Sequence, residues 1–372
     1  MKLTGLRVVD LSVFLPGPYL TMSLADHGAE VIKVEAPGIG DPAREIGKRD
    51  GPSTVFFRNF NRGKRSVVLD LKTEVGRLAL LRLVDRADVF VEAFRPGVMA
   101  RLGLDFESLA RRNPRLVYCS ISAFGQEGPY RDRPAHDLAT EALGGILSIN
   151  LGHDGTPAIP GLPAADLLSA LQGLSGILMA LYRRERTGQG DFLDISMQAS
   201  ILAACPNIVG SVFAEGLQPV VENERSLGGS AFYQVYQTAD RRHLVLGGQE
   251  IKFVRNLLDA FGRPDFVSLC EMGPGPHQAP LVAFLREKFR EKTLVQWSAW
   301  FEGRDICFAP VNSLPEAFDD PQAKAFGTLH TDELGRKHLA PAIRFRNERA
   351  SPNWKEPTLG EATAQYCGSL SP

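Results

Sequence analysis

Acidic residues stand at the start of three expected helices in this 372-residue chain. His136 and Asp137 form an adjacent pair after a charged loop, Asp166 opens the next helix, and Glu250 opens a third. An acid at a helix N-terminus is most simply a capping residue, worth about 1 kcal/mol. Acids on two successive helix starts can also share one cleft, and carboxylates beside an imidazole are side chains that general acid–base catalysis uses. We therefore treat these four residues as the candidate catalytic set.

A second set of candidates is a group of basic residues near the front of the chain, interleaved with glycines and few acids. Its members are Lys33, Arg44, Lys48, Arg58, Arg62, Lys64, Arg65 and Arg95. A solvated basic face is one interpretation. The other is a site for a phosphorylated ligand, because guanidinium groups bind phosphate through two parallel hydrogen bonds. The sequence leaves both open.

Several common catalytic signatures are missing from the sequence. The loop after the first expected strand reads Pro16-Gly17-Pro18, where a dinucleotide fingerprint needs three glycines, and there is no P-loop. We therefore expect neither NAD nor ATP as a cofactor. There is no GxSxG motif, and the five scattered cysteines contain no CxxC, so we expect no serine or thiol nucleophile and no metal site. Such cysteines fit a reducing cytoplasm best, and no secretory signal is visible.

Composition narrows the class of protein further. The chain has 42 Lys and Arg against 43 Asp and Glu, a net charge of −1. This argues against a nucleic-acid or anionic-membrane partner, because binding either normally requires a basic excess. At 44% hydrophobic residues, we expect a globular protein of two or three domains. The longest uncharged stretch, 195–214, is expected to be a core helix rather than a membrane span.

Strands and helices alternate in the segments that must position the candidate residues. Strands are expected at 6–11, 31–35, 66–71, 88–94, 116–123 and 192–197, with helices between them that include 137–149 and 165–184. This alternation predicts an α/β, Rossmann-like domain with a parallel sheet, because parallel strands need crossover connections. A hairpin over 233–247 and the helices after it predict a smaller α+β domain.

An ordered set of short motifs runs along nearly the whole chain. They are LRVVDLS (6–12) with PGP (16–18), LADHGAEVIKVE (24–35) with GD (40–41), NRGKRS (61–66), RPG (95–97), YCSISAFG (118–125), the block around Asp137 and RTGQG (186–190). The set resembles the family III CoA-transferases, also called the L-carnitine dehydratase/bile-acid-inducible protein F family. This family also includes α-methylacyl-CoA racemase.

The resemblance implies an architecture and a ligand. The large domain would comprise residues 1–200 completed by about 327–372, with a linker helix at 201–221 and the small domain at 222–320. Two ring-like protomers would interlink as a homodimer. Coenzyme A or an acyl-CoA would bind the large domain as substrate, a carboxylic acid would be its partner, and the phosphates would contact Lys33, Arg44, Lys48, Arg95 and Arg101.

The same resemblance implies two alternative reactions. In a transferase, Asp137 would attack the thioester and an aspartyl-CoA intermediate would follow. In a racemase, His136 assisted by Glu250 would serve one face of the α-carbon and Asp166 the other. We place transfer ahead of racemisation, because Asp137 is present and most members of the family are transferases. A CoA-binding protein without catalysis is disfavoured, because no candidate acid is missing.

Overall fold

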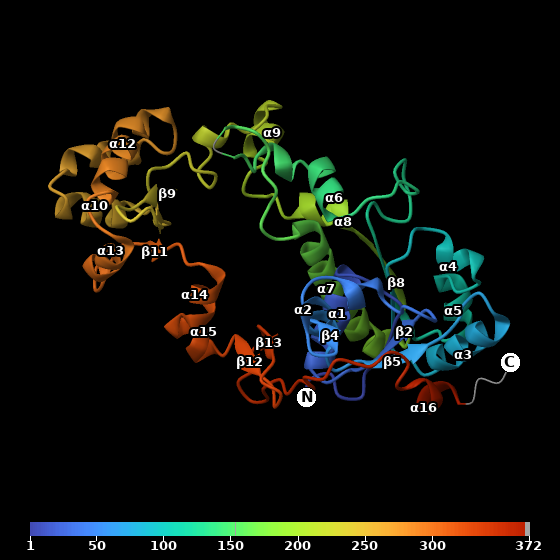
Figure 1. Ribbon diagram of the computed structural model, residues 1–372. Coiled ribbons are helices and arrows are strands. Elements are labelled where there is room, and N and C mark those ends of the chain that lie inside the picture. The colour runs from blue at the N-terminus through green and yellow to red at the C-terminus, as the bar shows by residue number, and fades with distance from the viewer. Residues whose placement is uncertain (153, 369–372) are drawn as a thin grey trace. The chain divides into compact units, whose positions relative to one another are not determined.

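A six-stranded parallel sheet forms the centre of the computed structural model, which describes residues 1–152 and 154–368 (Figure 1). The strand order is β5-β2-β1-β6-β7-β8, and every neighbouring pair is parallel. The strands are β1 (Arg7–Asp10), β2 (Glu30–Glu35), β5 (Arg65–Val68), β6 (Val89–Glu92), β7 (Val117–Ser122) and β8 (Asp191–Ser196). The predicted α/β class with a parallel sheet is confirmed.

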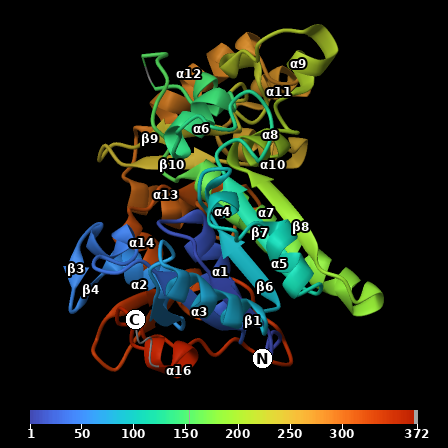
Figure 2. The same ribbon diagram turned by 90° about the vertical axis from the view of Figure 1, so that its right-hand side faces the viewer.

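Apolar side chains alternate between the two faces of this sheet. Val9, Ile32 and Phe90 pack with helices on one face, whereas Val8 and Val31 pack on the other. The helices of the first face are α3 (Glu74–Val84), α4 (Val98–Arg101), α5 (Phe106–Arg112) and α16 (Thr363–Cys367); those of the second are α1 (Pro16–Asp26), α7 (Ala164–Thr187) and α8 (Met197–Ala203) (Figures 1 and 2). Both faces are covered, as parallel sheets require.

The chain changes direction across the sheet at β1. From β1 it continues to β2 and β5 on one side, and then returns to β6, β7 and β8 on the other. The loops that follow β1 and β6 therefore leave the carboxyl edge in opposite directions. In open parallel sheets this arrangement leaves a crevice where ligands bind.

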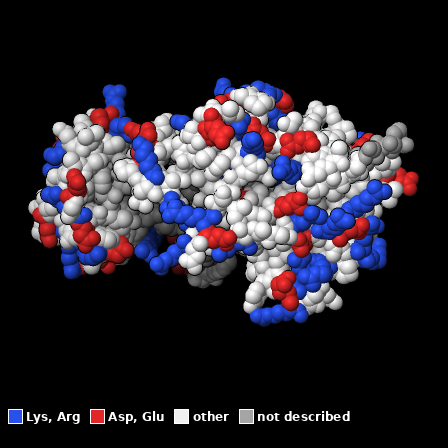
Figure 3. Space-filling model, turned by 90° about the horizontal axis from the view of Figure 1, so that it is seen from below, with Lys and Arg blue, Asp and Glu red and all other residues white. Residues whose placement is uncertain are grey.

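Two compact units divide the chain, the first containing residues 1–150, 158–204 and 321–372. Its remaining elements are η1 (Pro42–Glu45), β3 (Arg49–Asp50), β4 (Ser53–Thr54), α2 (Val55–Asn61), α6 (Asp137–Leu143), η2 (Ile146–Ser148), α15 (Pro321–Phe326), β12 (Leu329–Thr331) and β13 (Lys337–Leu339). On the face shown in Figure 3, basic and acidic side chains are interspersed, in keeping with the net charge of −1.

The second unit contains residues 151–157 and 205–320. Its antiparallel sheet has the order β11-β10-β9, and aromatic residues such as Phe289 and Trp297 fill its core. Its elements are α9 (Gly210–Glu215), η3 (Val221–Asn223), β9 (Gln234–Gln237), β10 (His243–Leu246), α10 (Ile251–Ala260), η4 (Pro264–Phe266), α11 (Val267–Glu271), η5 (Pro276–Gln278), α12 (Ala279–Phe289), α13 (Leu294–Phe301), β11 (Phe308–Pro310) and α14 (Leu314–Asp319).

Two sequence predictions about helices were wrong. The helix expected over 137–149 ends at Leu143, because Gly145 adopts a φ of +83° before the short turn η2. The single helix expected over 201–221 is replaced by the end of α8 and the short α9. Pro206 lies between these two helices, and proline has no N–H to continue a helical hydrogen-bond ladder.

Helix α7 is the longest helix of the described residues. It packs on α1 and on strands β7 and β8. Within the described residues it is also the one helix long and apolar enough to cross a membrane. Of the most apolar 18-residue stretch of this helix, 33% is buried. Large apolar side chains on its surface, Leu171, Leu178, Met179 and Tyr182, are between 42% and 65% exposed.

Candidate active site

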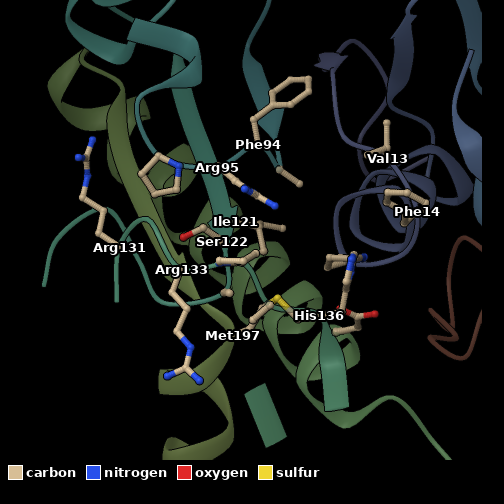
Figure 4. Close-up of a pocket in the computed structure, with 17 residues that line it drawn as sticks. Val13, Phe14, Phe94, Arg95, Ile121, Ser122, Arg131, Arg133, His136 and Met197 are labelled. Atoms are coloured by element: carbon tan, nitrogen blue, oxygen red, sulfur yellow. The ribbon is translucent and has the colours of Figure 1, made fainter. Parts of the chain in front are cut away.

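A cavity of about 220 Å³ opens at the carboxyl edge of the six-stranded sheet (Figure 4). Its walls come from the carboxyl ends of four strands and the residues that follow them. Val13, Phe14 and Pro16 follow β1, Ala93 to Pro96 follow β6, Ile121 to Ala123 lie at the end of β7, and Met197 follows β8. Segment 133–136 and Asp166 complete the wall, together with Arg131. The cavity therefore occupies the crevice created where the strand order reverses.

Two of the predicted catalytic residues, His136 and Asp166, line this cavity together. His136 is the N-cap residue of α6, but its side chain makes no capping hydrogen bond and is exposed. Asp166 lies in the first turn of α7. These two side chains come from successive helix starts, whereas the predicted shared cleft concerned the two acids Asp137 and Asp166.

Asp137, which the family resemblance implies as the nucleophile, has its carboxylate on the backbone of α7. It is the first residue of α6, and its Oδ1 accepts a hydrogen bond of 3.0 Å from the backbone N–H of Asp166. The carboxylate therefore satisfies a free N–H at the head of α7, which makes it a cap for the neighbouring helix. Asp137 is not among the residues that line the cavity.

Glu141 joins Asp137 and Asp166 in a group that we call the carboxylate cluster. Its side chain is fully buried, and Oε1 accepts a hydrogen bond of 2.7 Å from the N–H of Ala164. No described residue donates a hydrogen bond to Oε2. Burial, followed by the nearby Asp137 carboxyl, raises the pKa of Glu141.

Asp166 is the member of the carboxylate cluster that faces the cavity. Burial, and then the charges of Asp137 and Glu141, raise the pKa of Asp166 to about 7. Among the described residues, no Lys or Arg forms an ion pair with any of the three carboxyls. A carboxyl that titrates near neutral pH in a cavity is suited to nucleophilic or acid–base chemistry.

Arginine side chains gather on another part of the cavity wall. Arg95, Arg131 and Arg133 line it directly. A Cβ atom added to Gly97 would lie 3.3 Å from Nη2 of Arg131 and 3.4 Å from Nη1 of Arg101. Two guanidinium groups thus converge beside a glycine whose missing side chain leaves them room. This is a suitable arrangement for a phosphorylated ligand.

Arg131 and Arg133 were missed by the sequence prediction, although the loop that carries them was recognised as charged. The signal that was available is their closeness to a candidate residue, because Arg131 and Arg133 lie five and three positions before His136. Arg95 and Arg101, in contrast, were predicted from the family motif, and the structure places them at or beside the cavity.

Lys33 and Arg44 were predicted to contact the phosphates of CoA, and the structure places both in ion pairs instead. Lys33 is completely buried, and its Nζ lies 2.9 Å from Oδ2 of Asp41. Arg44 donates two hydrogen bonds to Glu35, of 2.8 and 2.7 Å. Neither cation is free to bind phosphate, because each already neutralises a buried acid.

These two pairs belong to a larger group that we call the paired network, which consists of Asp10, Lys33, Glu35, Asp41, Arg44 and Lys64. In it Lys64 lies 3.0 Å from Asp10, and both side chains are fully buried. Lys48, the remaining predicted phosphate ligand, is exposed between η1 and β3 and is not part of the cavity wall.

A further acid, Glu92, ends strand β6 directly before the loop that carries Arg95. It is 4% exposed, and its Oε2 accepts a hydrogen bond of 2.8 Å from the N–H of Phe94. Burial raises the pKa of Glu92 to about 7. Sequence reasoning missed this residue, although an acid inside an apolar strand was a visible signal.

Glu250 belongs to the second unit, where it lines a separate cavity of about 290 Å³ with Arg225, Tyr233 and Gln249. It is the N-cap residue of α10, but its side chain makes no capping hydrogen bond. Its predicted assistance to His136 stays a prediction. No group of three or more His, Cys, Asp or Glu side chains that could hold a metal ion is found within residues 1–152 and 154–368.

Comparison with known proteins gives a consistent result. Residues 3–363 match the model of CoA-transferase family III. The chain is 32% identical to the mouse succinyl-CoA:glutarate CoA-transferase, over 97% of this chain and 84% of that protein, and 35% identical to the human alpha-methylacyl-CoA racemase, over 98% and 92%. It is also similar to the crystal structure of a CAIB/BAIF family protein from Brucella suis, with a TM-score of 0.84, 31% identity and 99% of both chains covered.

Proposed function

Because the chain belongs to CoA-transferase family III, we propose that it transfers CoA from an acyl-CoA thioester to a carboxylic acid, with Asp166 as the nucleophile. One observation carries the choice of residue. Asp166 faces the cavity and titrates near pH 7, whereas Asp137 holds the backbone of α7 and is absent from the cavity wall. We therefore assign to Asp166 the nucleophilic role that the family resemblance implied for Asp137.

The proposed reaction needs no group beyond the two substrates. An Asp166 oxygen attacks the thioester carbonyl and expels CoA thiolate, which forms a mixed anhydride. The thiolate then attacks the aspartyl carbonyl, releases the donor carboxylate and leaves an aspartyl-CoA thioester. The acceptor carboxylate repeats these two exchanges in reverse order and departs as the new acyl-CoA, which restores the Asp166 carboxylate.

The surroundings of Asp166 support this chemistry in two ways. The head of the long helix α7 places a partial positive charge beside Asp166, where negative charge develops on the carbonyl oxygen. Desolvation raises the proton affinity of the carboxylate, which makes it a stronger nucleophile once it is ionised. Arg95, Arg101 and Arg131 are the residues that we propose for the CoA phosphates.

Racemisation of a 2-methylacyl-CoA is the second candidate function. It is favoured by one observation, the presence of His136 and Asp166 in the wall of the same cavity. In this reaction one of the two would remove the α-proton and the other would return a proton to the opposite face. The human racemase at 35% identity belongs to the same set of relatives.

Two assays run side by side test these proposals. Acyl-CoA is incubated with a panel of carboxylic acids and the new thioester is measured; in parallel, 2-methylacyl-CoA is incubated in D2O and deuterium at the α-carbon is measured. A transferase should form a new acyl-CoA and incorporate no deuterium. A racemase should incorporate deuterium at the α-carbon and form no new acyl-CoA. Absence of both activities would overturn both proposals.

The nucleophile is identified by trapping. Hydroxylamine added during turnover converts an aspartyl thioester to a hydroxamate, and peptide mass spectrometry locates it. We expect the modification at Asp166 and none in the Asp166→Asn variant. A hydroxamate at Asp137 instead would return the nucleophile to the residue that the sequence analysis selected.

We also propose that the protein is a homodimer in which a second copy covers the apolar surface of α7. The support is the exposure of Leu171, Met179 and Tyr182 on a helix otherwise packed against the sheet, because large exposed apolar patches commonly mark interfaces. Light scattering after size exclusion should give twice the chain mass of 40.7 kDa. A monomer mass at micromolar concentration would contradict this proposal.

A further inference from the structure

Phe14 has an unusual backbone conformation for its residue type. It follows β1 and has a φ of +64°, and Arg241 is the one other non-glycine residue with positive φ among residues 1–152 and 154–368. A bulky side chain in this region costs on the order of 1–3 kcal/mol, and such strain concentrates at functional sites. Arg241 lies in a hairpin turn, where the conformation is common, but Phe14 does not.

Buried charges of the paired network hold Phe14 in this conformation. The N–H of Phe14 donates to Oδ1 of Asp41 at 3.2 Å, and Asp41 is fully buried. Oδ2 of the same carboxyl pairs with Lys33, whose Nζ also donates to the carbonyl oxygen of Ser12 at 2.8 Å. Both ends of the segment 12–14 are therefore tied to one ion pair, which fixes the direction of the Cα–Cβ bond of Phe14.

The ring of Phe14 lies at the cavity rather than in the core. It is 37% exposed, and it meets the His136 ring edge to face, with centroids 6.2 Å apart and an interplanar angle of 87° (Figure 4). Phe94 and Arg95 are on the wall formed after β6. The strained residue thus presents an apolar surface beside one of the two candidate acid–base groups.

We propose that Phe14 determines acyl-group specificity: its ring forms the wall that limits the acyl end of the cavity to short chains. This inference rests on the proposed function, since it assumes an acyl-CoA ligand with its thioester at Asp166. The cavity of about 220 Å³ is smaller than the ~300–1,000 Å³ of sites that enclose whole ligands, so it holds only part of an acyl-CoA and leaves little room for a long acyl chain. The fixed backbone sets the direction of the Cα–Cβ bond of Phe14, from which the ring extends beside His136.

The test measures binding without chemistry. The non-reactive thioethers S-ethyl-CoA and S-octyl-CoA are titrated into the full-length protein by calorimetry, and the ratio of their dissociation constants is compared between variants. In Phe14→Ala we expect the affinity for S-octyl-CoA to increase about tenfold relative to the affinity for S-ethyl-CoA. This change corresponds to burying about two more methylene groups of the octyl chain. Phe14→Leu should give an intermediate ratio.

Further variants separate the ring from the backbone. Phe14→Gly relieves the positive φ and removes the ring, so it should match the ratio of Phe14→Ala without a loss of thermal stability. Phe345→Leu makes the same deletion as Phe14→Leu at a residue that is also 37% exposed but does not line this cavity, and should leave the wild-type ratio unchanged.

The possible outcomes distinguish this inference from the function on which it rests. If S-ethyl-CoA binds and the ratio is the same in wild type and Phe14→Ala, the specificity role of Phe14 is wrong while CoA binding stands. An equal gain in Phe345→Leu and Phe14→Leu would also overturn it. If neither thioether binds to the wild-type protein, the proposed function fails together with this inference.

Discussion

Two groups of partly or fully buried acidic residues in the sheet-bearing unit have opposite electrostatic surroundings. In the paired network each acid has a cation, as in the 3.0 Å contact between Asp10 and Lys64. In the carboxylate cluster, Asp137, Glu141 and Asp166 have only one another and backbone N–H groups. The two regions therefore separate the effect of burial from the effect of a partner charge.

The pKa values diverge accordingly. Although burial by itself raises the pKa of Asp10, the Lys64 and Lys33 ammonium groups, with the hydroxyls of Ser12 and Thr21, lower it to about 2. For Asp166, burial and the neighbouring carboxyls act in the same direction and bring the pKa to about 7. A compensated acid stabilises the fold, whereas an uncompensated one is available for chemistry at neutral pH.

The largest effect is expected from removing the uncompensated acid that faces the cavity. Asp166→Asn should lower kcat for CoA transfer by about 10⁴-fold, because an amide cannot attack the thioester. Asp137→Asn should cost less than about 100-fold, since the amide oxygen still accepts the hydrogen bond from the N–H of Asp166. Steady-state rates measure both, and an equal loss in the two variants would remove the distinction between them.

The next effect concerns the paired network and appears in stability. Lys64→Met leaves the fully buried Asp10 without its nearest cation, and should lower the free energy of unfolding by roughly 3–5 kcal/mol. Arg112→Met breaks an exposed ion pair with Asp85 and should cost about 1 kcal/mol or less. Urea unfolding measures the free energy of unfolding of both variants. Similar decreases would mean that burial does not determine how much an ion pair contributes to stability.

The third prediction is a pH dependence of the proposed reaction. Asp166 must be ionised to attack, so kcat/KM should fall about tenfold for each pH unit below about 7 and reach a plateau above it. Glu92 also titrates near 7, but it holds the loop of Phe94 instead of facing the thioester. Glu92→Gln is therefore the control, and loss of the inflection in that variant would assign the profile to Glu92.

The same two regions predict opposite effects of pH on stability. The lowered pKa of Asp10 contributes stability that is present above its usual value of 3.8 and is lost as the pH falls through about 2. The raised pKa of Asp166 makes stability decrease with rising pH between 3.8 and about 7, because the unfolded chain ionises first. Asp166→Asn should remove that decrease, which unfolding curves at pH 5 and pH 8 would show.

The smallest effect tests the mutual influence within the carboxylate cluster. Asp137→Asn removes one like charge, so the inflection of the kcat/KM profile should move down by about one pH unit or less. An inflection that stays in place would mean that burial alone raises the pKa of Asp166.

Local patterns in the sequence determined much of this protein. Alternating strand and helix signals predicted the parallel sheet, and the ordered motifs indicated the family that the comparisons confirm. The sequence also selected His136, Asp137 and Asp166 as candidates, because acids at helix starts and a His-Asp pair are visible within a few residues.

Only the tertiary structure decided which of these side chains face the cavity and which cations are already paired. Asp137 contacts the backbone 29 residues further on, and Lys64 reaches Asp10 across 54 residues. A carboxylate or an ammonium looks the same in sequence whether it is free or compensated. Its role depends on which groups the folded chain brings within about 3 Å, and that is set by the packing of elements far apart in the sequence.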